Sequence, residues 1–169
     1  MKITKNLPTF LNQQALILVT GRQEAVGYEA LDGQLTEVFR SVVPKPKQQE
    51  KEGRFESRVG GKVIRSGGVY EADKREVEKK LIKEIVDQLK KLSLPKEVYL
   101  FSPAEVLPAI EKKMPVEWQK RIVMRFVGNF YRHHPFKVLG KIKDKREEKK
   151  VVATDEEAFG ILKRRKNRK

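Results

Sequence analysis

Residues 53–68 combine four cations with two glycine pairs and only one acidic residue. Glycine adopts positive φ angles and lets another backbone approach closely, while arginine and lysine donate hydrogen bonds to phosphate oxygens. The segment therefore predicts a mobile phosphate-binding loop rather than a catalytic centre. The alternative is a long flexible hairpin loop whose charges only keep the protein soluble. The candidate nucleic-acid-binding residues here are Arg54, Arg58, Gly60, Gly61, Lys62, Arg65, Gly67 and Gly68.

A second group of cations lies at the end of the sequence, in a run over residues 163–169 that contains no acidic residue. Contacts between such clusters and phosphates dominate non-specific RNA affinity. A solvated tail is the alternative interpretation. The members that we add to the candidate nucleic-acid-binding set are Lys163, Arg164, Arg165 and Lys166.

Other chemistries find little support in the sequence. The chain has no cysteine, so it has no disulfide, thiolate ligand or thiol nucleophile. His133 and His134 are the only histidines, and adjacent side chains in a turn rarely converge on one metal ion. Ser57 and Ser66 have no evident triad partners. We expect no catalytic residue, no metal and no cofactor. Several aromatic residues could stack on bases, but their apolar neighbours favour a place in the core: Trp118, Phe126, Phe130 and Tyr131.

Composition points to a polyanionic partner. The 169 residues include 38 basic and 23 acidic ones, which gives a formal net charge of +15. RNA or a ribonucleoprotein fits better than a membrane, because the basic stretches lack the large apolar faces of interfacial helices. Met1 opens on a polar stretch, and no apolar run reaches the roughly 18 residues of a membrane span. We therefore expect a cytoplasmic protein without signal peptide or anchor.

The glycine-rich segment leads directly to a helix with clear signals. Asp73 is a good N-cap, and Glu76 can complete a capping box. Apolar residues then recur at helical spacing from Val77 to Leu92, with lysines mostly off that stripe, and Pro95 follows its end. A helix that packs on the core and exposes a basic back is predicted.

The elements before the loop predict a three-stranded meander. The continuous apolar run 15–19 indicates a central strand that is buried on both faces. Asp32-Gly33 is typical of a tight hairpin and joins the predicted strands 24–30 and 35–43. A polar linker over residues 44–52, with two prolines, separates the meander from the glycine-rich segment.

After the main helix, a strand–helix–strand pattern over residues 97–127 predicts a parallel crossover. Ser102 is the expected N-cap of the crossover helix, and Pro108 requires either a kink or a short first turn followed by a restart. The run 121–127 suits a strand or a helix, and we favour the strand. A short helix should open at His134-Pro135. We expect one α/β domain over residues 1–142, a mixed sheet with helices on its faces, and a flexible basic C-terminal extension over residues 143–169.

This order of elements resembles a known family. The meander, the basic glycine-rich loop and the amphipathic helix are followed by Val-Tyr-Leu-Phe-Ser-Pro at 98–103 and Ile-Val-Met-Arg-Phe-Val-Gly-Asn at 122–129. Over roughly residues 14–142 they resemble the bacterial and archaeal relatives of the peptide-chain release factor middle domain, in particular the single-domain host attachment protein branch. The resemblance implies a ribonuclease H-like fold and a link to ribosomes or tRNA.

The resemblance also implies a limit on the chemistry. True release factors carry Gly-Gly-Gln at the loop tip, where the glutamine positions water at the peptidyl-tRNA ester. Here the glycine pairs precede Lys62 and Val69, and a lysine cannot orient water as a side-chain amide does. We therefore expect a translation-associated accessory that binds RNA, either ribosomal RNA or tRNA, or the ribosome. The alternatives are a hydrolase of tRNA esters or RNA with variant loop chemistry, and a host attachment-type protein that binds an acidic protein partner.

Overall fold

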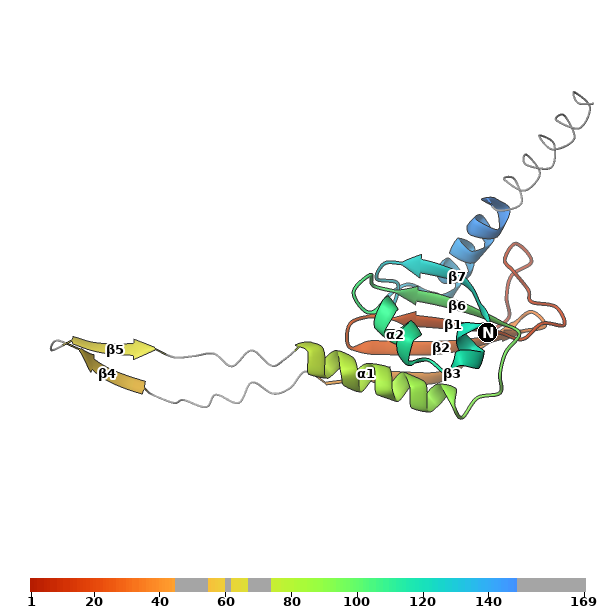
Figure 1. Cartoon of the computed structure of the whole chain (residues 1–169). Coiled ribbons are helices and arrows are strands. Elements are labelled where there is room, and N and C mark those ends of the chain that lie inside the picture. Colours follow the sequence, from red (N-terminus) through yellow and green to blue (C-terminus); the bar gives the residue numbers. More distant parts are fainter. Residues whose placement is uncertain (45–54, 60–61, 67–73, 149–169) are drawn as a thin grey trace, which may run out of the picture.

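The computed structural model describes residues 1–44, 55–59, 62–66 and 74–148 (Figure 1). Within them, two sheets are formed: a five-stranded sheet of order β3-β2-β1-β6-β7 and a separate two-stranded sheet of β4 and β5. The elements are β1 (Ala15–Thr20), β2 (Glu24–Leu31), β3 (Gln34–Val42), β4 (Phe55–Val59), β5 (Lys62–Ser66), α1 (Lys74–Leu89), β6 (Glu97–Ser102), α2 (Leu107–Lys113), α3 (Val116–Gln119) and β7 (Ile122–Val127). A further helix, called the C-terminal helix here, covers residues 135–148.

The main sheet is mixed, as predicted. β2 runs antiparallel to β1 and β3, whereas β6 runs parallel to β1 and β7. Only β2 is therefore reversed among the five strands, and the predicted crossover between β6 and β7 is confirmed. All six residues of β1 are buried, which confirms the predicted central strand. Asp32 and Gly33 have φ angles of 47° and 75° in the β2–β3 turn, and such positive angles are typical of tight hairpins.

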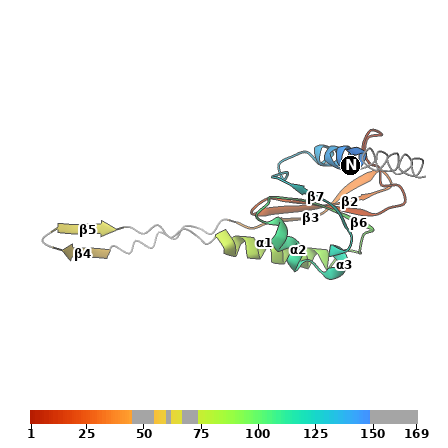
Figure 2. The same ribbon diagram turned by 45° about the horizontal axis from the view of Figure 1, so that its top comes forward.

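Helices cover both faces of this sheet (Figure 2). α1, α2 and α3 lie on one face and share a core with alternate residues of the strands. The predicted apolar stripe of α1 is confirmed, and its buried members are Val77, Leu81, Ile82, Ile85 and Leu89. Trp118 of α3 is also buried there. Lys79, Lys80 and Lys83 of α1 are exposed, as expected for a basic back.

The other face is covered by the N-terminal segment and the C-terminal helix. Ile3 and Phe10 come from the former, and Val138, Leu139 and Ile142 come from the latter. The helix predicted to open at His134-Pro135 is present, but it continues to residue 148 within the described chain. The helix therefore continues past residue 142, the expected end of the domain.

The prediction for Ser102 is wrong. Ser102 is the last residue of β6, it is buried, and its hydroxyl donates to the carbonyl of Pro103 (3.3 Å) instead of capping a helix. The amides of Val106 and Leu107 both donate to the Pro103 carbonyl at 3.1 Å and close a single turn. α2 begins only at Leu107, with Pro108 in its first turn, where a missing N–H is tolerated. The short turn followed by a restart is thus the alternative that holds.

Gly27 of β2 is required by a cross-strand contact. A Cβ atom at this position would lie 2.3 Å from Cε1 of Phe39, which is opposite Gly27 in the β2–β3 pairing. We expect Gly27→Ala to lower the free energy of unfolding by about 1–3 kcal/mol, because the buried ring must move. Urea denaturation measures this cost. In a Phe39→Leu background the cost should shrink, and an equal cost in both backgrounds would contradict the steric explanation.

Candidate nucleic-acid interface

The candidate nucleic-acid-binding residues fall in two groups, one inside and one outside the described residues. The described hairpin contains Arg58 in β4 and Lys62 and Arg65 in β5. The remaining candidates lie outside the described residues, and they are Arg54, Gly60, Gly61, Gly67, Gly68, Lys163, Arg164, Arg165 and Lys166.

The two strands of this hairpin are the feature that the sequence analysis missed. Backbone pairing places Val59 opposite Lys62, Arg58 opposite Val63 and Glu56 opposite Arg65. In the described chain, β4 and β5 form a sheet of their own, between β3 and α1 in the sequence (Figure 1). A sequence signal was available, because short runs of β-branched and aromatic residues around a Gly-Gly pair are typical of a two-residue hairpin.

The segment that contains the β4–β5 hairpin, called the insertion here, follows β3 in the sequence. β3 ends on the same side of the main sheet as the parallel strand β1. Val42, the last residue of β3, pairs with Glu24, and Thr20, the last residue of β1, pairs with Ala25. Ligands of open α/β sheets bind outside the carboxyl ends of the strands. The hairpin is thus joined to the main sheet at the end where a binding site is most expected.

Three residues with hydroxyl side chains lie at these strand ends. Thr20 and Ser102 end β1 and β6, and Ser41 lies one residue before the end of β3; all three are buried. The Thr20 hydroxyl donates to the carbonyl of Phe101 at 3.4 Å. In the described part of the chain, no three His, Cys, Asp or Glu side chains form a group that could hold a metal ion.

Arg40 lies two residues before the end of β3 and forms hydrogen bonds with Glu37 and Tyr131. Its Nε and Nη2 donate to the two carboxylate oxygens of Glu37, at 2.8 and 2.6 Å, and its Nη1 donates to the Tyr131 hydroxyl at 3.1 Å. The hydrogen bond from Arg40 lowers the pKa of the Glu37 carboxyl. Arg22 in the β1–β2 turn likewise pairs with Glu105 at 3.0 Å. Binding a phosphate at either arginine would compete with these contacts.

The loop after β7 is held by aromatic contacts. Phe130 meets Phe101 edge to face, with ring centroids 5.2 Å apart, and His133 meets Phe130 at 5.5 Å. Nδ1 of His134 accepts a hydrogen bond from the amide of Phe136. Both histidines therefore have local roles in the turn. Of the four aromatic residues considered for stacking, Trp118 and Phe126 are buried, whereas Phe130 and Tyr131 are partly buried against the core.

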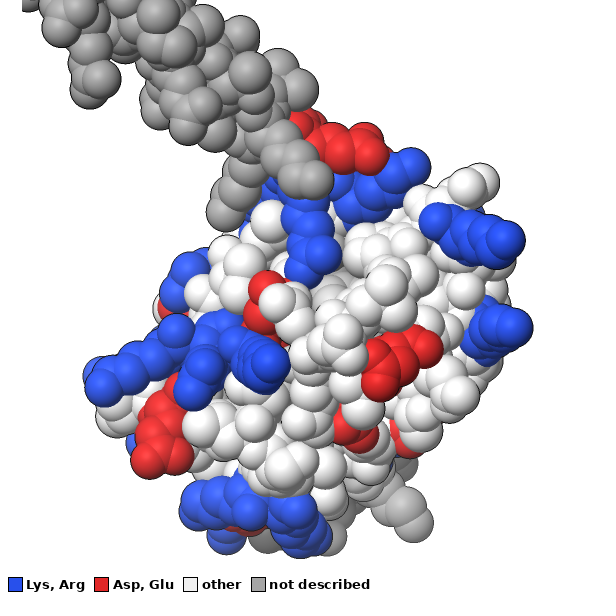
Figure 3. Space-filling view, turned by 90° about the vertical axis from the view of Figure 1, so that its right-hand side faces the viewer, with Lys and Arg blue, Asp and Glu red and all other residues white. Residues whose placement is uncertain are grey.

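Exposed cations are spread over several surfaces. On α1, Arg75, Lys79 and Lys83 recur every four residues and are exposed, which places them along one side of the helix. Lys90 pairs with Asp87 at 3.7 Å near the end of α1. Figure 3 shows the right-hand side of Figure 1, where lysine and arginine side chains form separate groups with acidic side chains and uncharged surface between them. The described residues on that side offer no continuous basic surface.

Arg146 anchors the C-terminal helix to the main sheet. Its guanidinium donates to the Glu97 carboxylate at 2.8 Å and to the Tyr99 hydroxyl, and the Tyr99 hydroxyl donates to Glu97 at 2.7 Å. The guanidinium carbon also lies 5.0 Å from the centre of the Phe10 ring. The neighbouring Lys145 donates to the carbonyl of Arg125 in the edge strand β7 at 2.8 Å. These contacts fix the helix that leads to the C-terminal basic cluster.

Burial raises the pKa of Tyr99 above its ordinary value of 10.0, and the hydrogen bond to Glu97 acts in the same direction. The neutral phenol therefore stabilises the fold below pH 10, and this contribution is lost as the pH rises through the higher folded-state pKa. We expect the free energy of unfolding to fall above pH 10, and to fall less steeply in Tyr99→Phe. Urea denaturation between pH 8 and 11 compares the two slopes. Identical slopes would contradict the role assigned to Tyr99.

The described part of the chain contains no helix that is both long and apolar enough to cross a membrane. No protein-family model matches the sequence. No curated protein matches it either.

Proposed function

We propose that this protein is a release-factor-like domain with a ribonuclease H-like fold that binds RNA or the ribosome and acts as a translation-associated accessory. The observation that carries the proposal is the β4–β5 hairpin, which lies between β3 and α1 in the sequence. β3 belongs to a five-stranded sheet in which only β2 is antiparallel to its neighbours. The resemblance over roughly residues 14–142 implies a ribonuclease H-like α/β fold, with a glycine-rich loop before the main helix. The two segments quoted for the resemblance, 98–103 and 122–129, lie in the paired strands β6 and β7 and in the residues that follow these strands.

Charge supports RNA as the partner. The chain carries a formal net charge of +15, and the segment 53–68 holds four cations against the single acidic residue Glu56. Phosphate contacts by such residues supply most of the non-specific affinity for nucleic acid. The insertion follows the carboxyl end of β3, where ligands of such sheets bind, and the exposed cations of α1 offer further contacts to RNA phosphates. Lys62, in place of the family's glutamine, favours binding over ester hydrolysis.

The first test follows the protein through sucrose gradients of cell lysate at low and high salt, with and without ribonuclease. Comigration with ribosomal particles should be lost at high salt and after ribonuclease treatment, because electrostatic contacts to RNA weaken with salt. A protein that stays at the top of the gradient under every condition would contradict ribosome binding. Comigration that survives ribonuclease would favour the acidic protein partner instead.

A matched pair of variants assigns the binding to the hairpin. The hairpin variant carries Arg58→Gln, Lys62→Gln and Arg65→Gln, and the control carries Lys90→Gln, Lys96→Gln and Lys120→Gln, three exposed residues elsewhere. Both lose three charges. For purified RNA, the slope of log affinity against log salt should decrease by about 0.7–0.9 per lost phosphate contact in the hairpin variant only. Equal decreases would indicate that net charge alone drives binding.

Hydrolysis is tested separately with aminoacyl-tRNA esters as substrates. The accessory role predicts no turnover by the wild-type protein above the uncatalysed rate. Turnover that is abolished by Gly61→Ala would support the hydrolase alternative, because it would locate the chemistry at the glycine pair.

A further inference from the structure

Gly140 occupies the centre of the exposed side of the C-terminal helix. The residues that this helix buries are Val138, Leu139 and Ile142. At 100° per residue, Gly140 lies on the side away from them. Apart from its chain neighbours and the backbone of its own helix, no heavy atom lies within 4 Å of the position where a Cβ atom would stand. The main chain is therefore partly exposed to solvent at the middle of this helix.

Nothing in the fold requires glycine at this position. Among the described residues, the glycines with positive φ angles are Gly33 and Gly128, so Gly140 has no conformation that disfavours other residues. Glycine is the poorest helix former except proline, and any side chain would fit. A local rule that is broken without a structural gain is expected at functional positions. Close approach of a ligand to the backbone is one function that only glycine serves.

The neighbours of Gly140 have the chemistry of a nucleic-acid contact. Lys137 and Lys141 are exposed, lie one helical turn apart, and form no ion pair among the described residues. Phe136 precedes Gly140 by one turn; it packs in part against the core and is partly exposed, with the ring of His134 at 5.1 Å in an edge-to-face arrangement. The same side of the helix also carries the exposed Asp144, one turn after Gly140, and Glu147, which pairs with Lys143 at 3.8 Å. Cations beside accessible rings are typical of surfaces that bind single-stranded nucleic acid.

We propose that His134, Phe136, Lys137, Gly140 and Lys141, together called the Gly140 surface, contact the backbone of a single RNA strand. Lys137 and Lys141 would donate hydrogen bonds to phosphate oxygens, and Gly140 would let the sugar–phosphate chain approach the helix. The ring of Phe136 would stack on a base, which a single strand exposes and a duplex does not, with His134 at the edge of that ring. This inference rests on the proposed function and extends RNA binding to the face opposite α1–α3.

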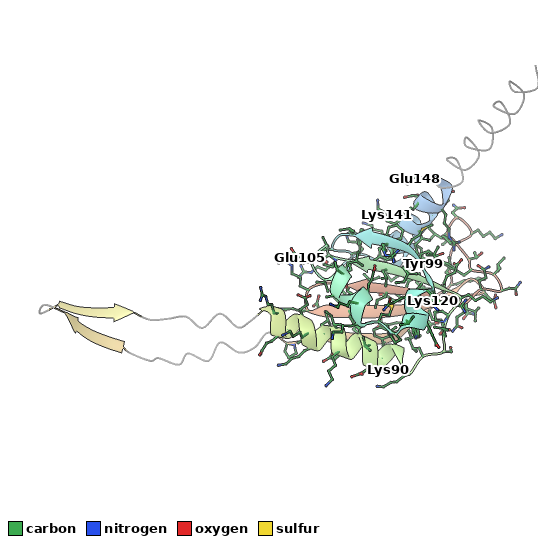
Figure 4. The ribbon with its side chains drawn as sticks, in the orientation of Figure 1. Lys90, Tyr99, Glu105, Lys120, Lys141 and Glu148 are labelled. Atoms are coloured by element: carbon green, nitrogen blue, oxygen red, sulfur yellow. The ribbon has the colours of Figure 1, made fainter. Side chains whose placement is uncertain are left out.

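The test combines one stabilising and one charge-removing variant, measured with a labelled unstructured RNA oligonucleotide and with an RNA duplex. Gly140→Ala should raise Tm by about 1–4 °C, because alanine favours the helix, yet weaken binding of the single strand severalfold. Lys137→Gln/Lys141→Gln should reduce the salt slope by about 0.7 for each lost contact. The control is Lys112→Gln/Lys120→Gln, whose residues are exposed on α2 and after α3; Figure 4 labels Lys141 and Lys120.

The outcomes separate this inference from the proposed function. A Gly140→Ala protein that is more stable and binds the single strand more weakly, with a control unchanged in salt slope, supports the Gly140 surface. Wild-type binding that neither variant alters would overturn the Gly140 surface and leave the proposed function standing. A wild-type protein that binds no RNA would overturn both. Equal competition by polyglutamate and RNA would overturn the surface in favour of an acidic protein partner.

Discussion

Replacing Phe101 with alanine is expected to lower the free energy of unfolding by about 3–5 kcal/mol, a large share of the stability of a domain of this size. Phe101 lies in β6 and is fully buried. Its ring stacks on that of Phe126 with a centroid distance of 4.1 Å and an interplanar angle of 1°, and meets Phe130 edge to face. The variant removes both ring contacts and leaves a cavity in the centre of the core, so burial and packing are lost together.

The effect should extend to the loop after β7. Phe130 packs on Phe101 and precedes the turn that opens the C-terminal helix, so hydrogen exchange should accelerate in residues 128–134 of Phe101→Ala. Urea denaturation measures the stability itself. Phe101→Leu, which retains most of the volume, is the control and should cost clearly less. A loss below about 1 kcal/mol in the alanine variant would mean that the core relaxes to fill the cavity.

Strong local signals explain the part of the fold that the sequence predicted. The run 15–19 became the fully buried β1 because continuous apolar residues suit only a strand covered on both faces. Asp32-Gly33 formed the hairpin because both residues tolerate positive φ angles. The stripe of α1 fixed its buried side through helical periodicity. Each of these signals is contained within a few consecutive residues.

Contacts between distant residues explain what the sequence did not predict. Ser102 has the local signature of an N-cap, but β6 continues through it because the carbonyl of Ser102 accepts a hydrogen bond from the amide of Gly128 near the end of β7. The charged residues after 142 have the composition of a tail. Lys145 and Arg146 nevertheless contact β7 and β6 from 20 and 49 residues away. Such partners are not visible in the local pattern.

The candidate site was predictable in its chemistry more than in its location. Charge and glycine content identified the segment 53–68. The structure was needed to show that β4 pairs with β5 and that the insertion follows the carboxyl end of β3. Gly140 was not considered, because a single glycine within a short predicted helix has no distinctive spacing. Only the open space around it and the burial of Val138, Leu139 and Ile142 reveal its exposed position.

Arg146→Ala is expected to lower the free energy of unfolding by about 2–4 kcal/mol, because the variant removes a charged hydrogen-bond donor and a cation–ring contact. Glu97 keeps only 23% of its side chain exposed, so its carboxylate would lose a partner in a partly buried environment. Phe10 would lose the guanidinium 5.0 Å from its ring, and the long arginine stem would no longer pack there. Urea denaturation should show the loss, and hydrogen exchange should show it first in residues 135–148.

The matched control for Arg146→Ala is Lys143→Ala on the same helix. Lys143 pairs with Glu147 at 3.8 Å, but their side chains are 42% and 62% exposed, and exposed pairs contribute little to stability. Equal effects of the two variants would show that helix charge matters and the buried contacts do not. A cycle with Tyr99→Phe then measures the coupling between Arg146 and the Tyr99 hydroxyl. A coupling free energy near zero would assign the stabilisation to Glu97 and Phe10, whereas a large one would make Tyr99 the centre of the anchor.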